Sequence, residues 1–152
     1  MTTIKGETAE NKYVSIPGDT NGKFTILCFA SSKKAQHDLE TWLDPVYNKY
    51  IAKTGLMDDM FDVNVFVIPV FKGANAAIRE SIKRKFRETA QQDLWPHVLF
   101  CKEGMNEIGA SLGLQNDDIP YFFLLDKEGG IIYRTNGNYT DEKFDGMDDK
   151  IE

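Results

Sequence analysis

The stretch "KFTILCFA" at residues 23–30 constrains the fold more than any other part of the chain, because it is apolar on both of its alternating faces. Successive side chains of an extended chain point to opposite sides. One side carries Phe24, Ile26 and Cys28, and the other carries Thr25, Leu27 and Phe29. A strand of this kind is typical of a sheet that is covered by helices on both faces. We therefore expect an α/β fold with a central sheet.

The residues that follow this strand predict a helix. Ser31 and Ser32 are good N-cap residues, and residues 33–55 carry apolar side chains at helical spacing. Pro45 has no backbone N–H, so it should kink or interrupt the helix. Gly55 is a suitable stop signal. The chain therefore leads from a buried strand directly into the N-terminus of a helix.

The same two periodicities predict the remaining elements. In chain order they are a strand at 62–71, a helix at 75–90, a short strand at 97–103, a short helix at 104–114, two strands at 121–126 and 130–135, and a closing helix at 140–152. The helix at 75–90 is expected to turn a stripe of Ile78, Ile82 and Phe86 inward. Strand–helix–strand units imply parallel strands, and the "KEGG" connection implies an antiparallel hairpin on the same sheet.

A length of 152 residues fits a single domain spanning residues 1–152, with a core of its own. Residues 1–22 are polar and contain two turn signals. We expect at most one short edge strand there, near residues 13–16. Residues 1–12 are expected to be a flexible or loosely ordered lead-in.

Composition and charge exclude several classes of function. A net charge of −6 disfavours binding to nucleic acids and to anionic lipid surfaces. No apolar run approaches the roughly 20 residues that a membrane-spanning helix needs. The first 13 residues contain no apolar signal-peptide core, so a cytoplasmic location is predicted, with an origin in the cell envelope left open for a trimmed chain.

The other candidates for chemistry have plain structural explanations. His37 and His97 stand apart from any matching cluster, so no metal site or catalytic triad is predicted, and no cofactor either. The basic stretch at 79–88 is expected to be the solvated face of an amphipathic helix, without the aromatic platform of a nucleic-acid site. The acidic stretches at 58–62 and 116–118 lack the spacing of a calcium loop.

Three stretches of the chain resemble the thioredoxin fold, and more narrowly its peroxiredoxin and thiol-oxidoreductase branch. "NGKFTILCFASSKKAQ" is similar to that family's lead-in, in which a buried strand runs into a Cys-x-x-Cys pair. "IPYFFLLDKEGGIIYRTNG" is similar to its proline–hairpin motif, with Pro120 where the family has a cis proline; the isomer of the Ile119–Pro120 bond stays open. "YTDEKFDGMDDKI" fits the closing helix. The resemblance covers residues 13–151 and implies a thioredoxin-like three-layer sandwich, with a mixed central sheet flanked by helices.

Alignment with this motif shows that the chain lacks both catalytic sulfurs. Lys33 falls on the first cysteine of the family and Gln36 on the second. In the family the first cysteine reacts because the helix N-terminus lowers its thiol pKa, and the second resolves the mixed disulfide. Lysine and glutamine do neither. The family's redox activity therefore does not carry over to these positions.

The leading hypothesis is a non-catalytic, redox-inactive domain that binds another protein or an extended peptide, or that assists assembly. It would use the face on which the family binds substrate chains. On this chain that face consists of Ser31, Ser32, Lys33, Lys34, Gln36, Ile119 and Pro120. The two lysines raise the further hypothesis of an anion site at the helix N-terminus, against the plainer reading of two solvated side chains. The stretch from Ile78 to Arg134 is also similar to a mitochondrial ATP synthase assembly factor family built on this fold.

Alternatives from other classes stay open. One is a thiol oxidoreductase or peroxidase-like enzyme that uses Cys101, with or without Cys28. Two cysteines are too few for a disulfide scaffold, and Cys28 is expected to be an inert core thiol. A Cys28–Cys101 disulfide would need Cα atoms within about 7 Å. Another alternative is a structural domain without a ligand, and the partner and the oligomeric state stay open as well.

Overall fold

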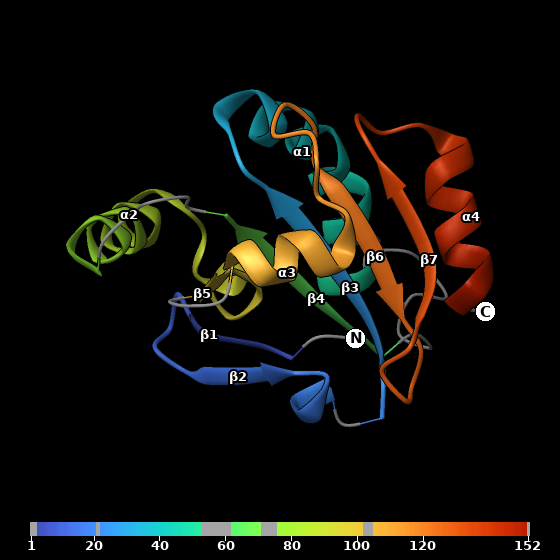
Figure 1. Ribbon diagram of the computed structural model, residues 1–152, viewed down its shortest axis with the longest axis horizontal. Coiled ribbons are helices and arrows are strands. Elements are labelled where there is room, and N and C mark those ends of the chain that lie inside the picture. The colour runs from blue at the N-terminus through green and yellow to red at the C-terminus, as the bar shows by residue number, and fades with distance from the viewer. Residues whose placement is uncertain (1–2, 21, 53–61, 71–75, 102–104, 152) are drawn as a thin grey trace.

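The computed structural model describes residues 3–20, 22–52, 62–70, 76–101 and 105–151 (Figure 1). The strands are β1 (Ile4–Thr8), β2 (Tyr13–Ile16), β3 (Phe24–Ala30), β4 (Val63–Pro69), β5 (Leu99–Cys101), β6 (Tyr121–Leu125) and β7 (Ile131–Asn136). The α-helices are α1 (Lys33–Val46), α2 (Ala76–Thr89), α3 (Met105–Leu112) and α4 (Asp141–Ile151). Shorter helical segments are η1 (Gly18–Thr20), η2 (Tyr47–Ile51) and η4 (Gln92–His97).

The strands form two sheets. The larger one has the order β4-β3-β6-β7, with β3 and β4 parallel and the other neighbours antiparallel. The smaller one has the order β2-β1-β5 and is antiparallel throughout. An isolated parallel bridge between Val67 and Val98 connects the two. The early parallel pair and the late antiparallel hairpin are therefore as the sequence predicts.

Two hydrophobic clusters cover the two faces of the larger sheet. One contains buried side chains of α1 and α4, and the other contains those of α3 and of the smaller sheet. Figure 1 shows α3 in front of the sheet and α1 behind it. Ile26 and Cys28 belong to the first cluster, whereas Leu27 and Phe29 belong to the second. The two-sided apolar pattern predicted for β3 is confirmed, because each face of β3 is buried under its own layer.

Strand β1 lies within residues 1–12, where the sequence predicts no strand. Residues 1–12 are not simply a loose lead-in, since β1 pairs with β2 on one side and with β5 on the other. Ile4, Thr8 and Ala9 are buried. The sequence gives little sign of this strand because Ile4 is its one large apolar side chain, and its order depends on two partners elsewhere in the chain. The single strand predicted near residues 13–16 is present as β2.

Pro45 lies one residue before the end of α1, and the chain continues from Val46 as the π-helix η2. A proline cannot donate to the carbonyl four residues earlier, so the regular ladder is disturbed there. A π-turn is one way to accommodate such a break. The predicted interruption is thus confirmed. Gly55, predicted as the stop, and Asp58 and Asp59 lie outside the described residues.

Helix α2 follows the prediction only in part, since Phe86 is half-buried with its ring 6.5 Å from that of Phe100, and the side chain of Ile78 lies outside the described residues. Ile82 is 37% exposed, whereas Lys83 is 2% exposed. The ammonium group of Lys83 forms an ion pair with the carboxylate of Glu7 on β1. Arg79 and Arg87, four residues to either side, are half-buried. The solvated basic face is therefore wrong for Lys83, because a contact with a residue 76 positions away overrides the local apolar pattern.

Candidate functional site

Helix α1 begins at the same end of the strands of the larger sheet as the loop that leads into β6. Strand β3 ends there at Ala30, and β6 starts there at Tyr121, because the two strands are antiparallel and pair Phe29 with Tyr121. In Figure 1 this loop lies beside the N-terminal end of α1. The sheet topology therefore brings the two halves of the predicted binding face together.

A hydrogen bond from Ser32 ties these two halves to each other. Its Oγ accepts from the backbone N–H of Ala35 at 3.1 Å, which makes Ser32 the N-cap of α1. The same Oγ donates to the carbonyl of Asp117 at 2.6 Å, across 85 positions of sequence. One hydroxyl thus caps the helix and holds the 116–120 loop against it.

The loop also has its own internal hydrogen bonds. The N–H of Asn116 donates to the hydroxyl of Tyr121 at 2.9 Å, and the N–H of Asp118 donates to the side-chain oxygen of Asn116 at 2.9 Å. These short-range contacts fix the turn before β6 from within. The loop is therefore held both by its own side chains and by the helix.

Pro120 does not follow a cis peptide bond. The cis bond recorded in the described residues is Ile16–Pro17, and Ile119–Pro120 is not among the cis bonds. The carbonyl of Pro120 accepts from the N–H of Gly137 at 3.0 Å, next to the β6–β7 ladder. The cis proline implied by the resemblance is thus not found here, and the carbonyl at this position is already paired within the protein.

The residues predicted to form the binding face lie together at this end of the strands, and we call them the helix-mouth face. They are Ser31, Ser32 and Ile119, which are half-buried, Lys33, Lys34 and Gln36, which are exposed, and Pro120, which is buried. The first turn of α1 has no acidic residue. Two cations therefore lie at the positive end of the helix dipole, and the face combines a cationic rim with a small apolar edge.

Trp42 supports this face from beneath. Its ring stacks on Phe122 of β6, with centroids 4.2 Å apart, and meets Tyr139 edge-on at 5.4 Å. Its indole N–H donates to the carbonyl of Gly137 at 3.0 Å. Because Trp42 is 1% exposed, these contacts anchor α1 on the β6–β7 hairpin and hold the helix mouth in place.

The two cysteines lie away from the helix mouth and on opposite faces of the sheet. Cys28 belongs to the cluster under α1, and Cys101 to the cluster under α3. Both are free and 3% exposed. Burial raises the pKa of the Cys28 thiol far above its usual value and raises the pKa of Cys101 to about 12. Neither sulfur is poised as a thiolate.

A hollow of about 530 Å³ lies along the outer edge of β4. We call it the β4-edge groove; its walls include the tip of the β1–β2 hairpin, the end of η2 and the first residues of β4. The Nδ1 atom of His97 lies 2.9 Å from the carbonyl of Val65 in this wall. That contact requires a proton on Nδ1, because a carbonyl oxygen can only accept. The sequence interpretation of His97 as a strand-end residue did not reveal this groove.

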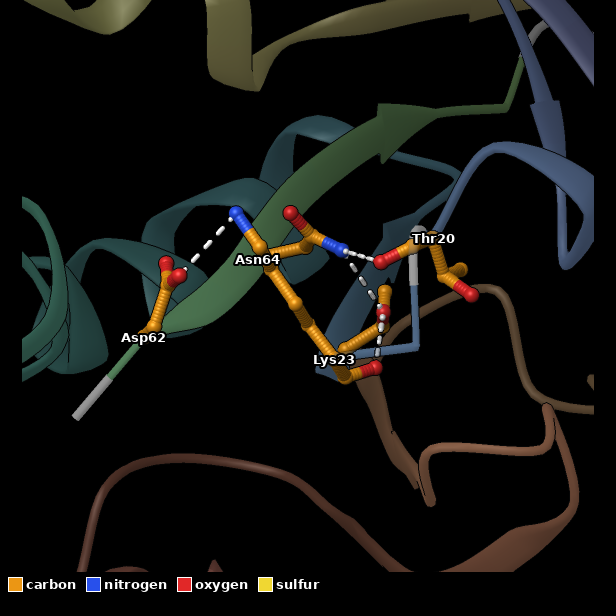
Figure 2. Close-up of polar contacts among 5 residues, drawn as sticks. Thr20, Lys23, Asp62 and Asn64 are labelled. Atoms are coloured by element: carbon orange, nitrogen blue, oxygen red, sulfur yellow. Dashed lines mark hydrogen bonds and ion pairs between the residues drawn. The ribbon is translucent and has the colours of Figure 1, made fainter.

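Figure 2 shows the polar contacts at one end of the groove. The side-chain N–H₂ of Asn64 donates to the carbonyl of Thr20 at 2.9 Å and to the hydroxyl of Thr25 at 3.2 Å. Lys23 and Asp62 form an ion pair at 3.1 Å. The one sequence signal for this network was a polar Asn64 within an otherwise apolar strand.

A third polar cluster joins η2 to α4. The carboxylate of Asp148, which is 9% exposed, accepts from the hydroxyl of Tyr50 and lies 2.5 Å from the ammonium group of Lys49. The cluster satisfies a buried charge and fixes the last helix on the core. Within the described ranges, no three His, Cys, Asp or Glu side chains are grouped so that they could hold a metal ion.

Together these features define a thioredoxin-like fold, as the resemblance predicts. The thioredoxin domain of a thiol-disulfide oxidoreductase from Bacteroides vulgatus is similar with a TM-score of 0.65 and 19% identity, over 99% of this chain and 94% of that chain. The exposed lipoprotein thioredoxin Etrx1 of Streptococcus pneumoniae gives 0.62 and 14%, over 97% and 99%. BsSco, a member of the Sco family of cytochrome c oxidase assembly proteins, gives 0.57 and 13%, over 97% and 89%.

These TM-scores support the fold alone, since identities of 13% to 19% do not transfer the activity of the neighbours to this chain. No protein-family model matches the sequence, and no curated protein matches it either. Of the helices in the described ranges, none is long and apolar enough to cross a membrane. The cytoplasmic location remains a prediction.

Proposed function

We propose that the chain is a non-catalytic thioredoxin-like domain that binds an extended segment of another protein on the helix-mouth face. The observation that carries this proposal is the hydrogen bond between Ser32 and Asp117, which holds the helix mouth and the 116–120 loop side by side. Lys33 and Gln36 stand there in place of a thiol pair. The helix-mouth face therefore retains a surface on which a partner chain can bind, but it lacks the two sulfur atoms that exchange disulfides.

The state of the two thiols supports a role without turnover. A nucleophilic cysteine reacts as the thiolate, and burial raises the pKa of both thiols in this chain. The alternative, an oxidoreductase that uses Cys101 with or without Cys28, would need a sulfur that substrates can reach. Cys101 is 3% exposed and lies in the cluster opposite to that of Cys28. We therefore rank this alternative second.

Assembly is one biological role that such a dock would serve. BsSco belongs to a family of cytochrome c oxidase assembly proteins, so this fold is compatible with assembly work. The sequence resemblance to an ATP synthase assembly factor family points in the same direction. An assembly role needs a surface that holds a partner chain, and the helix-mouth face would supply it.

Binding and turnover are tested on the same protein. S-carboxymethylated insulin B chain, a thiol-free extended peptide, is titrated into the ¹⁵N-labelled chain. We expect amide shifts at Ser32, Lys33 and Asp117 and none at Glu128 in the far hairpin. In parallel, the chain should not accelerate reduction of insulin disulfides by dithiothreitol. No shift at the helix mouth, or multiple turnovers that Cys101→Ala abolishes, would overturn the proposal.

A further inference from the structure

The outer edge of β4 carries backbone groups that point away from its sheet. The N–H of Val70 donates to the carbonyl of Ala30 on β3, so even-numbered positions of β4 turn their backbone groups toward β3 and odd-numbered ones turn away. Two contacts agree with this alternation on the outer side. Val67 bridges to Val98, and the carbonyl of Val65 meets His97.

Three backbone groups are left at the Val63 end of this edge. They are the N–H and the carbonyl of Val63 and the N–H of Val65, for which the described residues offer no backbone partner. All three lie where the β4-edge groove runs, since Val63 and Val65 line it. An edge with donors and an acceptor in a hollow is a template for one more strand.

The groove has an apolar wall above and below the plane of the sheet. Tyr50 and Ile51 come from the cluster under α1, and Val14 and Phe66 come from the cluster on the α3 side. Successive side chains of an added strand would point alternately at these two walls. The groove thus offers both the backbone pairing and the side-chain contacts of strand addition.

The charges around the groove determine which charge is favoured on a segment that binds there. Its lining includes the carboxylates of Glu10, Asp19 and Asp62 against the ammonium group of Lys12. Glu10 is exposed, and the Asp62 side chain is 70% exposed in its pair with Lys23. The whole chain carries a net charge of −6. A guest with lysine or arginine side chains is therefore favoured over an acidic one.

We propose that the β4-edge groove is a second docking site, which takes an extended basic segment of a partner protein as an added strand on β4. It is separate from the helix-mouth face. In the parallel pair β3–β4, Phe24 and Val63 mark the starting end, whereas Ala30 and Pro69 mark the end beside the helix mouth. The two sites therefore lie at opposite ends of the same strands and do not compete for one segment.

The first test uses two matched synthetic peptides on the intact chain. The probe is acetyl-Val-Lys-Val-Lys-Val-Thr-amide, and the control carries glutamate in place of both lysines. Titration of the ¹⁵N-labelled protein should shift the amides of Val63, Val65 and Ile51 with the basic peptide. The acidic peptide should bind at least about fivefold more weakly, as expected for the loss of one exposed ion pair or more.

Two pairs of variants locate the binding. Val63→Pro removes the outward N–H at the first residue of an edge strand, where proline is tolerated, and Val63→Ala shortens the side chain but keeps that N–H. The proline variant should bind about three- to tenfold more weakly than the alanine variant, the range of one net hydrogen bond. Glu10→Lys should weaken binding about threefold, and Glu40→Lys, an exposed reversal on α1, should not.

Several outcomes would overturn the proposal. Shifts confined to residues 31–36 and 116–120 would place the basic peptide on the helix-mouth face. That result would support the proposed function and would exclude the groove as a docking site. Equal affinity of the two peptides would remove the charge selection. Equal affinity of the two Val63 variants, with unchanged circular dichroism, would remove strand addition. Concentration-dependent dimerisation that Val63→Pro abolishes would make a second copy of this chain the occupant instead of a basic partner.

Discussion

Lys83 of α2 forms an ion pair with Glu7 of β1, although only 2% of the lysine and 12% of the glutamate side chain are exposed. The pair joins a helix at the side of the molecule to the smaller sheet (Figure 1). A buried pair of this kind matters most when one partner is removed, because the other charge is then left without compensation.

We therefore expect Lys83→Met to lower the free energy of unfolding by about 3 kcal/mol. Lys85→Met, an exposed position on the same helix, should change it by less than about 0.5 kcal/mol. The double variant Lys83→Met with Glu7→Gln should recover part of the loss, since no charge is then stranded. Urea unfolding of the four proteins measures this, and a Lys83→Met variant as stable as the parent would contradict the buried pair.

Substitutions at Ser32 separate its two hydrogen bonds. Ser32→Ala removes both and should cost about 1 kcal/mol or somewhat more. Ser32→Asp keeps an acceptor for the N–H of Ala35 but has no hydroxyl to donate to Asp117. Its stability should stay close to that of the parent, while hydrogen exchange in residues 116–120 becomes faster. Ser31→Ala is the matched control, and loop exchange that stays unchanged in Ser32→Asp would show that the hydroxyl does not hold the loop.

A cysteine at Lys33 tests whether the helix mouth still activates a thiol. In Lys33→Cys the helix N-terminus should lower the thiol pKa below its usual value of about 8.5. Glu40→Cys, an exposed position within the same helix, should keep an ordinary pKa. The rate of iodoacetamide labelling against pH compares the two. The double variant Lys33→Cys with Gln36→Cys should close a reducible disulfide, and a folded protein that fails to do so would show that the motif is misplaced.

The native thiols predict a pH dependence of stability. Burial raises the pKa of Cys28 and Cys101 above the ordinary value of a free thiol, so the folded state keeps protons that the unfolded chain releases. Their stabilising effect is complete below about pH 8 and is lost as pH rises above about 9, by up to about 1.4 kcal/mol per pH unit for each thiol. The variant with both cysteines changed to alanine should lose less stability between pH 8 and 10. Parallel pH curves for the two proteins would contradict this prediction.

Local patterns predicted most of the elements because those patterns are local in origin. The two-sided apolar strand, the Ser-Ser start of α1 and the hairpin around "KEGG" each follow from neighbouring residues, and all three are confirmed. Strand β1 was missed because its pairing with β2 and β5, rather than its own composition, orders it. The inward face of α2 was predicted correctly at Phe86 but wrongly at Ile82, and Lys83 is buried instead because it pairs with the distant Glu7.

The candidate site divides in the same way. The residues of the helix-mouth face could be chosen from the motif, and the antiparallel pairing of β3 with β6 brings them together. The hydrogen bond from Ser32 to Asp117 and the trans peptide bond before Pro120 could not be predicted from the sequence, because each depends on how the loop packs against the sheet. The β4-edge groove had no sequence signal beyond Asn64, since its walls come from four separate parts of the chain.

The sequence by itself determined the layered α/β architecture and the absence of a Cys-x-x-Cys pair, because periodicity and residue identity are properties of neighbouring positions. Only the tertiary structure decided which face of α2 is buried, how the helix mouth is tied to its loop, and where β4 leaves an open edge. Each of these depends on a pairing between distant residues. Such a pairing forms only when the whole chain has buried its apolar surface and each buried polar group has found its partner.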